Sequence, residues 1–183
     1  MAGRLIAVVG PSGVGKDTIM AEVLRQRPDI ICMRRVITRD ADCGGESFDG
    51  VSVDEFLAME QDGKFALSWQ AHGLHYGVPR QMDDHLADGR CVMFNGSRAQ
   101  MAKAVEQYPE ILILSITAST RILAERLASR GRETPQDIEQ RLKRAQSATM
   151  PEGRAVEIQN DGPLTEAVDA FLDAIGRTRE PVR

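Results

Sequence analysis

Short apolar runs alternate along the chain with longer segments in which apolar residues recur every three or four positions. The first run, "RLIAVVG", is apolar without interruption from Leu5 to Val9 and rich in β-branched residues, which is typical of a strand buried on both faces of a parallel sheet. The next segment, residues 16–25, places Ile19 and Val23 on one face of a helix. Because strands and helices alternate in this way, the sequence predicts an α/β fold with a mainly parallel sheet flanked by helices.

The same patterns place the remaining elements. Strands are expected at residues 4–9, 30–38, 65–69, 90–95, 110–116 and 155–160. Helices are expected at residues 16–25, from 52, at 79–87, 97–107 and 120–130, from 134, and at 163–175. Ser52 and Glu55 have the spacing of a capping box, and Pro79 suits the first turn of a helix. Residues 40–50 are polar and glycine-rich and residues 72–77 read "HGLHYG", so a loop and a turn are expected there.

Composition narrows the classes of partner. Hydrophobic residues make up 42% of the chain and charged residues 27%, which is ordinary for a globular protein. The apolar runs are too short to span a bilayer, and the N-terminal segment lacks the apolar core of a signal peptide. We therefore expect a cytoplasmic protein that does not bind membranes. A net charge of −4 argues against non-specific nucleic-acid binding but permits small anionic ligands, because local arginines matter more than the total.

The segment "GPSGVGKDT", residues 10–18, is close to the phosphate-binding pattern G-x-x-x-x-G-K-[S/T]. It lies between a predicted strand and a predicted helix, where the motif requires it. The glycines let the backbone turn tightly near a ligand, and the start of the helix offers unpaired N–H groups and the positive end of its dipole. We expect ATP to bind here, with Lys16 directed at the β- and γ-phosphates. The predicted ATP-binding residues of the loop are Gly10, Pro11, Ser12, Gly13, Val14, Gly15, Lys16, Asp17 and Thr18.

Asp17 departs from the motif, because it stands where a hydroxyl that ligates magnesium is expected. Magnesium prefers hard oxygen ligands and usually takes one or two carboxylates together with phosphate oxygens. Two interpretations stay open. Asp17 could bind Mg²⁺ directly or through water, with Thr18 supplying a nearby hydroxyl, or Asp17 could only offset the helix dipole.

Basic residues cluster on both sides of Gly131. They are Arg126, Arg130, Arg132, Arg141, Lys143 and Arg144. Such a run usually marks a solvated helix face. Here the arginines flank a glycine between two short predicted helices, which suits a mobile lid that brings guanidinium groups onto a transferring phosphoryl group. We expect Arg130 and Arg141 to be catalytic together with Lys16, and Arg132 and Arg144 to lie either in the lid or on the surface.

The chain resembles the guanylate kinase-like branch of P-loop phosphotransferases over nearly its full length. The segments that carry the resemblance are, in order, "GPSGVGK", "TR", "HYG", "RG…ET…I…RL" and "NDG". The resemblance implies a P-loop NTPase-type fold with a small acceptor-binding insert and an arginine-rich lid. It also implies that Arg39 holds an acceptor phosphate, that Glu46 and Tyr76 line the acceptor pocket, and that Asn160 lies near adenine. We expect one domain of residues 1–183, with a helix-rich acceptor-binding subdomain at about 40–75 and the lid at about 126–146.

Several positions depart from the guanylate kinase pattern. Asp42 stands in or near the place of that family's second arginine, and Val51 or Ser52 in the place of a tyrosine used on the GMP phosphate. Asn95 replaces the acidic residue that ends the strand before "QG" in that family. These departures imply that the acceptor pocket is rebuilt, which argues against GMP.

A narrower resemblance fits all these departures. Four segments closely resemble the family of ribose 1,5-bisphosphate phosphokinases, which act in phosphonate breakdown. They are "GPSGVGKDT", "ITRDADCGGES", "FALSWQAHGLHYG" and "NGSRA". The resemblance implies transfer of the γ-phosphoryl group of ATP to the 1-phosphate of ribose 1,5-bisphosphate, giving 5-phosphoribosyl 1-diphosphate and ADP. The acceptor is already an anionic oxygen, so positioning and charge neutralisation suffice without a general base.

A sugar bisphosphate requires two phosphate ligands and partners for its hydroxyls. Arg39 and Arg98 are candidate phosphate ligands, while Asn95, Ser97 and His72 are candidates for the sugar hydroxyls, although His72 suits a turn equally well. Two other functions are considered. One is a nucleoside monophosphate kinase acting on GMP. The other is a non-catalytic, guanylate kinase-like module that recognises phosphopeptides, against which the intact glycines and lysine of the loop argue. The sequence leaves the oligomeric state open.

Overall fold

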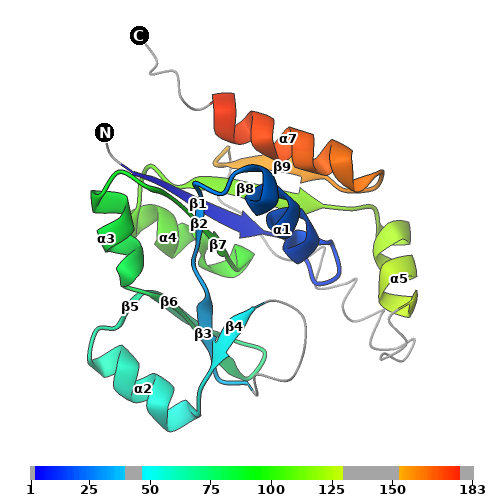
Figure 1. The fold of residues 1–183 in the computed structure, drawn as a ribbon. Helices are drawn as coiled ribbons and strands as arrows, with labels where there is room; N and C mark the ends of the chain where they lie inside the picture. The colour runs from blue at the N-terminus through cyan, green and yellow to red at the C-terminus, as the bar shows by residue number, and fades with distance from the viewer. Residues whose placement is uncertain (1–2, 40–46, 130–152, 178–183) are drawn as a thin grey trace.

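The computed structural model describes residues 3–39, 47–129 and 153–177. Within these residues the core is a five-stranded sheet in the order β2-β7-β1-β8-β9, and all its neighbouring strands are parallel (Figure 1). Its strands are β1 (Arg4–Val9), β2 (Ile31–Cys32), β7 (Cys91–Asn95), β8 (Leu112–Thr117) and β9 (Ala155–Gln159). The predicted α/β fold around a parallel sheet is confirmed.

Helices cover both faces of this core sheet (Figure 1). One face packs against α1 (Lys16–Gln26) and α7 (Leu164–Arg177). The other packs against α3 (Gln81–Ala87) and α4 (Met101–Gln107). The helix α5 (Thr120–Ser129) follows β8 and lies on the side toward which β1 and β8 point. Sites for ligands in such sheets lie at this carboxyl edge.

The residues of β1 show why a strand in this position is apolar throughout. Ile6 and Val8 belong to the cluster that includes Phe171 of α7. Leu5 and Ala7 point the opposite way and belong to the cluster that includes Met82 of α3. Because helices cover both faces, both sets of alternating side chains are buried, and the polar-apolar alternation of a half-exposed strand is absent.

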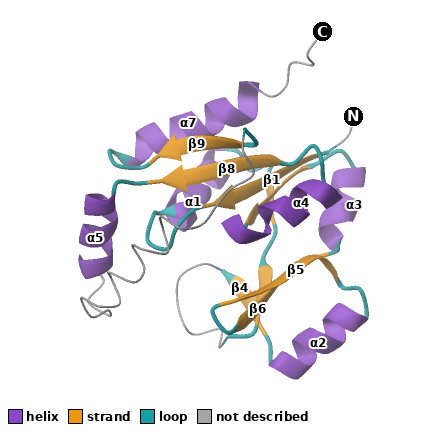
Figure 2. Cartoon of the chain, turned by 180° about the vertical axis from the view of Figure 1, so that it is seen from behind, coloured by secondary structure: helices purple, strands orange, loops and turns teal. Residues whose placement is uncertain are grey.

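A second sheet lies beside the core, in the order β4-β3-β6-β5 (Figure 2). Its elements, with the helix that accompanies them, are β3 (Arg35–Ile37), β4 (Phe48–Gly50), α2 (Val53–Gln61), β5 (Phe65–Ala71) and β6 (Leu74–Pro79). The expectation of a helix-rich subdomain is therefore wrong, since α2 is the only helix among the described residues of this region. We call residues 35–39 and 47–79 the insert.

Residues 30–38 were expected to form one strand and form two, which belong to different sheets. Ile31 and Cys32 pair with β7 of the core sheet, whereas Arg35–Ile37 pairs with β4 and β6 of the insert. Met33 marks the crossing, with its side chain buried and its N–H donating to the carbonyl of Met93 at 2.8 Å. Arg34 and Arg35 interrupt the apolar residues at the crossing, but the apolar residues on both sides of them favoured one continuous strand. Likewise, β4 falls inside the expected loop at 40–50.

The expected turn at residues 72–77 is much shorter in the structure. Only His72 and Gly73 form the turn, with φ of 53° and 75°, as a two-residue hairpin turn of type I′ requires. Leu74–Pro79 is strand, and Tyr76 pairs with Ile37. Pro79 ends this strand and does not begin a helix, since α3 starts two residues later.

The remaining elements agree with the expected ranges to within a few residues. Ser52 and Glu55 form the predicted capping box, in which the Glu55 N–H donates to Ser52 Oγ and the Ser52 N–H donates to Glu55 Oε2. A turn of 3-10 helix, η2 (Arg98–Gln100), precedes α4. The helix expected from residue 134 lies outside the described residues. Along the described ranges, no helix combines the length and apolarity needed to cross a membrane.

The insert has a small apolar core of its own. Phe56 of α2 stacks on Phe65 of β5 with ring centroids 4.6 Å apart, and Val36 joins them. Leu67 and Trp69 of the same strand instead join the core-sheet cluster, because a register shift between Phe65 and Leu67 reverses which side chains face which way. One strand thus contributes to two cores.

Gly77 is required by this packing. A Cβ added to Gly77 would lie 2.5 Å from the Phe65 ring, so we expect Gly77→Ala to lower the free energy of unfolding by about 1–3 kcal/mol. Gly176 in α7 has nothing within 4 Å of an added Cβ, and Gly176→Ala should raise stability by about 0.5–1 kcal/mol. Urea denaturation of both variants measures this difference. Equal effects of the two substitutions would contradict the assignment of Gly77 to a packing role.

Candidate functional site

Residues 10–15 connect β1 to α1 and form a loop whose backbone lies close to its neighbours. Gly10 and Gly15 have φ of 151° and 96°, which favour glycine strongly. A Cβ on Gly10 would collide with the carbonyl oxygen of Ile116, and one on Gly15 would lie 2.6 Å from Nδ2 of Asn160. The two glycines are therefore needed both for the turn and for close contact with the elements around it.

The carbonyl oxygen of Val14 fixes this loop to two distant elements. It accepts a hydrogen bond of 2.7 Å from Nδ2 of Asn160, which follows β9, and one of 3.2 Å from a guanidinium nitrogen of Arg126 in α5. Asn160 is 5% exposed and Val14 is fully buried. Buried polar groups of this kind are costly to leave unpaired, so the pair of donors stabilises one conformation of the loop.

Asp161 extends the same connection to the start of α5. Its carboxylate accepts a 2.7 Å hydrogen bond from the N–H of Ser119, directly before that helix, and one from Nε2 of Gln159. The bond from Ser119 and then that from Gln159 hold the pKa of Asp161 below its usual value. The neighbouring residues Asn160 and Asp161 thus join the glycine loop to the helix that carries Arg126.

Lys16 lies over the loop that precedes it. Its Nζ donates to the carbonyl oxygens of Gly10 at 2.9 Å and Pro11 at 3.2 Å. The ammonium is therefore held where the loop curves, next to the first turn of α1, whose N–H groups have no partner within the helix. A lysine charge and a helix N-terminus in one place form a site for phosphate groups.

Asp17 and Asn95 meet at the carboxyl edge of the sheet. Nδ2 of Asn95 lies 3.2 Å from Oδ1 of Asp17. Asn95 ends β7, is 9% exposed, and pairs with Val8 of β1. Asp17 belongs to the first turn of α1 and is exposed. The residue expected at the sugar and the residue expected at magnesium are in direct contact.

The chain after Asn95 continues beside the end of β1, the strand that leads into the glycine loop. The N–H of Gly96 donates to the carbonyl of Val8 at 2.8 Å, and Ser97 precedes η2, in which Arg98 is partly buried. Burial lowers the pKa of the Arg98 guanidinium, but an arginine stays charged. A charge with reduced solvation attracts an anion more strongly than a fully solvated one.

The acceptor candidate Arg39 follows β3, and the candidate Tyr76 lies on the neighbouring strand β6 of the insert. The Arg39 guanidinium carbon lies 4.4 Å from the centroid of Phe48, and its Nε is buried without a hydrogen-bond partner among the described residues. Tyr76 stacks on Trp69 with centroids 5.5 Å apart, and Arg35 lies 5.1 Å from the Tyr76 ring. An unpaired buried donor on Arg39 is compatible with an anionic ligand.

His72 lies at the tip of the β5–β6 hairpin and is exposed. Its φ of 53° is a conformation in which histidine is several times commoner than most residues. This geometry accounts for the residue through the turn alone, and its predicted contact with a sugar hydroxyl stays a prediction. Three further predicted site residues, Glu46, Arg130 and Arg141, lie outside the described residues.

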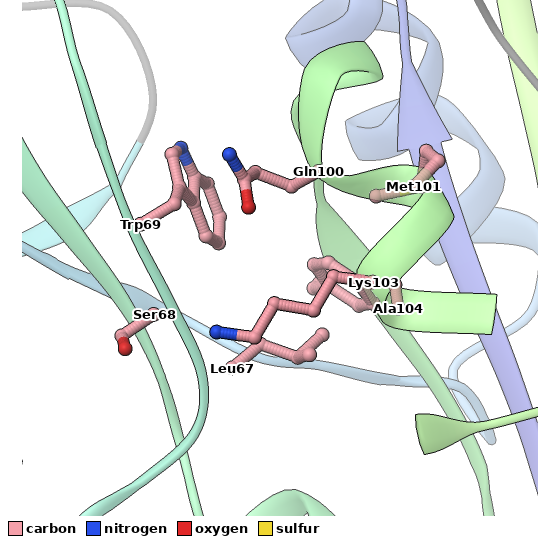
Figure 3. A pocket seen from close by; sticks show the side chains of 8 residues that line it. Leu67, Ser68, Trp69, Gln100, Met101, Lys103 and Ala104 are labelled. Carbon is pink, nitrogen blue, oxygen red and sulfur yellow. The ribbon is translucent and has the colours of Figure 1, made fainter. Parts of the chain in front are cut away.

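A small apolar pocket separates the insert from the core (Figure 3). Leu67 and Trp69 of β5 line one side, and Gln100 and Met101 line the other. None of the predicted site residues lines it. The pocket therefore belongs to the contact between the two sheets and is distinct from the polar edge that carries Lys16. Among the described residues, no cluster of three or more histidine, cysteine, aspartate or glutamate side chains is arranged to hold a metal ion.

The comparisons with known proteins agree on the family. Residues 2–175 match the family model described as guanylate kinase. A ribose 1,5-bisphosphate phosphokinase of Pseudomonas fluorescens is 45% identical over 179 residues, covering 94% of each protein. A ribose 1,5-bisphosphate phosphokinase of Rhizobium etli is 43% identical over 94% of this chain and 91% of its own length.

Solved structures support the fold. A guanylate kinase from Anaplasma phagocytophilum has a TM-score of 0.72 at 19% identity, with 99% of this chain and 88% of the other covered. A gluconokinase from Sinorhizobium meliloti has a TM-score of 0.56 at 20% identity, with 96% and 93% covered. At these identities the likeness concerns the fold alone.

A strand, a glycine loop with its lysine, and a helix at the carboxyl edge of a parallel sheet define a P-loop phosphotransferase. The chain belongs to the guanylate kinase family. Its similarity to the ribose 1,5-bisphosphate phosphokinases extends over almost its whole length. The resemblance inferred from the motifs is thereby confirmed.

Sequence reasoning missed how Arg126, Asn160 and Asp161 support the loop. Arg126 was grouped with the lid, and Asn160 was assigned to adenine, which stays a prediction. The only signal in the sequence was the polar pair "ND", which spans the end of a predicted strand, since polar side chains at the end of a parallel strand face the ligand edge.

Removing the amide of Asn160 should weaken the loop. Asn160→Ala leaves the buried carbonyl of Val14 with one donor fewer, so we expect the free energy of unfolding to fall by about 1–3 kcal/mol and ATP affinity to fall with it. Asn160→Asp places a carboxylate against that carbonyl and should be worse. Thermal denaturation and calorimetric ATP titration measure both effects. Gln61→Ala, which removes an exposed amide at the end of α2, is the control, and an equal loss in that variant would contradict this role.

Proposed function

We propose that this protein transfers the γ-phosphoryl group of ATP to the 1-phosphate of ribose 1,5-bisphosphate, giving 5-phosphoribosyl 1-diphosphate and ADP. The observation that carries the proposal is the similarity to ribose 1,5-bisphosphate phosphokinases over more than 90% of the chain. The intact phosphate loop, with Lys16 held over Gly10 and Pro11, supplies the chemistry that such a transfer needs. A cytoplasmic location remains a prediction from the sequence.

The roles proposed for the donor side follow from the loop geometry. Residues 10–18 surround the phosphates of ATP, and Lys16 exchanges its two backbone carbonyls for β- and γ-phosphate oxygens. Asn160 holds the loop, and we propose that it also lies near adenine. Arg130 and Arg141, which lie outside the described residues, would bring guanidinium charge to the transferring group.

The acceptor side is proposed to use the insert and the "NGSR" segment. Arg39 and Arg98 would bind the two phosphates of the sugar, because a guanidinium matches phosphate oxygens with paired donors. Ser97 and His72 are the candidates for its hydroxyls, and Asn95, which the sequence also assigned to them, is in contact with Asp17. Glu46 and Tyr76 would line the pocket. The attacking group is a phosphate oxygen that is already anionic, so these residues position it and reduce charge repulsion, and none has to remove a proton.

Asp17 fits a magnesium ion by its chemistry. Its carboxylate is exposed at the first turn of α1, and the hydroxyl of Thr18 is next to it. Both are hard oxygen ligands of the kind that magnesium prefers. A bound magnesium ion supplies charge neutralisation between the β- and γ-phosphates. Asp17 and Thr18 would hold that ion against the loop.

Phosphorus NMR of the products tests the proposed reaction. With ATP, magnesium and ribose 1,5-bisphosphate we expect new diphosphate signals of the phosphoribosyl product, and no turnover when GMP replaces the sugar. ADP with free phosphate alone would mean idle ATP hydrolysis and would refute the proposal. Turnover of GMP in preference to the sugar would identify a nucleoside monophosphate kinase instead. Failure to bind ATP at all would indicate a non-catalytic binding module.

The magnesium role of Asp17 has a separate test. Asp17→Ala should raise the magnesium concentration for half-maximal activity by roughly tenfold or more. Loss of a residue that only hydrogen-bonds to a metal ligand already lowers metal affinity by about that factor, and a direct ligand should matter at least as much. Asp88→Ala is a matched control, since Asp88 is an exposed aspartate between α3 and β7, at the amino edge of the sheet. An unchanged magnesium requirement in Asp17→Ala would remove this residue from the metal site.

A further inference from the structure

The contact between Asp17 and Asn95 joins two residues that are 78 positions apart in the chain. Asn95 is one of the two buried polar or charged residues among those described, and it ends the strand next to the strand that leads into the glycine loop. Its buried position makes the pairing of its amide energetically important. The direction of the bond is also informative, because the amide nitrogen donates and the carboxylate accepts.

P-loop phosphotransferases in general hold magnesium with a hydroxyl on the loop helix and a carboxylate from a second segment. In this chain the place of the carboxylate is exchanged, because it stands on the loop helix and the second segment carries none. The carboxylate of Asp17 stands on the helix, and the uncharged amide of Asn95 stands opposite at 3.2 Å. One carboxylate is present in either arrangement, so the charge presented to the ion and to the triphosphate is the same.

The alternatives to this arrangement are unfavourable on simple electrostatic grounds. Carboxylates at both positions would place two negative charges about 3 Å apart, where like charges repel strongly. A hydroxyl on the loop helix together with an amide at position 95 would leave the site without the carboxylate that magnesium usually takes as a ligand. An amide donor is the partner that tolerates Asp17 in its ionised form, since it bonds to the oxygen without adding charge.

We propose that Asp17 and Asn95 are an exchanged pair, in which Asn95 is a positioning residue that orients the Asp17 carboxylate toward magnesium and does not primarily bind the sugar. This inference rests on the proposed magnesium role of Asp17 and deepens the proposed function. It assigns Asn95 to the donor half of the site, because the described contact of its side chain is with the loop helix.

Four variants test the exchange: Asp17→Ser, Asn95→Asp, the double variant with both changes, and Asn95→Ala. The first readout is ATP affinity by calorimetry, with magnesium and with EDTA. The second is the melting temperature of the protein without nucleotide, measured in EDTA and with magnesium. Asp88→Ser is the matched control for loss of an aspartate far from the loop.

Magnesium increases the affinity for ATP, and in Asp17→Ser this increase should be roughly tenfold smaller than in the unchanged protein. Asn95→Asp should bind ATP more weakly in EDTA and melt at a lower temperature, because two carboxylates face each other, and magnesium should restore the melting temperature. The double variant, which has the usual hydroxyl and carboxylate, should recover most of the magnesium-dependent gain. Strictly additive effects of the two single changes on both readouts would overturn the exchange, because residues that act as a pair are not additive.

Asn95→Ala separates positioning from sugar binding. We expect it to reduce the magnesium-dependent gain in ATP affinity by roughly tenfold while leaving ATP affinity in EDTA unchanged. An unchanged magnesium dependence together with a raised KM for ribose 1,5-bisphosphate would overturn the proposal. All the ATP titrations omit the acceptor. Their outcome therefore tests the proposed pairing of Asp17 with Asn95 independently of which acceptor the NMR experiment identifies.

Discussion

The carbonyl oxygen of Val14 is the point on which the phosphate half of this molecule depends. A glycine loop has many backbone conformations when isolated, and here one of them is selected by donors from Asn160 and Arg126. Both donors come from beyond β8, so the last third of the chain determines the shape of a loop near its beginning. Gly15 lets Asn160 approach this closely, since any Cβ there would collide with the amide. The loop is thus shaped in advance of any ligand, which lowers the ordering cost of binding.

Charges at the carboxyl edge are arranged so that each has a partner before a nucleotide arrives. Lys16 is bonded to the carbonyls of its own loop, and Asp17 to the amide of Asn95. These bonds are of the kind that a phosphate or a cation can replace with stronger, charge-assisted ones. Binding therefore exchanges partners, so that neither Lys16 nor Asp17 has to lose one partner without gaining another.

The parts of the fold that depend on local sequence were predictable, and those that depend on distant pairing were not. The strand, glycine loop and helix around Lys16 are encoded by consecutive residues of one short segment, residues 4–26. The capping box of Ser52 and Glu55 is equally local. The division of residues 30–38 between two sheets is decided by β7 on one side and β6 on the other, which no local pattern reveals. The bond from Asn160 to Val14 spans 146 positions. Its existence could be read only from the folded chain.

The separate core of the insert has a consequence for how acceptor preference can change. Phe56, Phe65 and Val36 form a cluster of their own inside the insert, and β5 attaches the insert to the core through Leu67 and Trp69. We therefore expect that substitutions around Arg39 and Tyr76, the residues proposed to bind the acceptor, would leave the shape of the phosphate loop unchanged. Such a division lets the surface of the insert change without a change in the core that holds the phosphate loop.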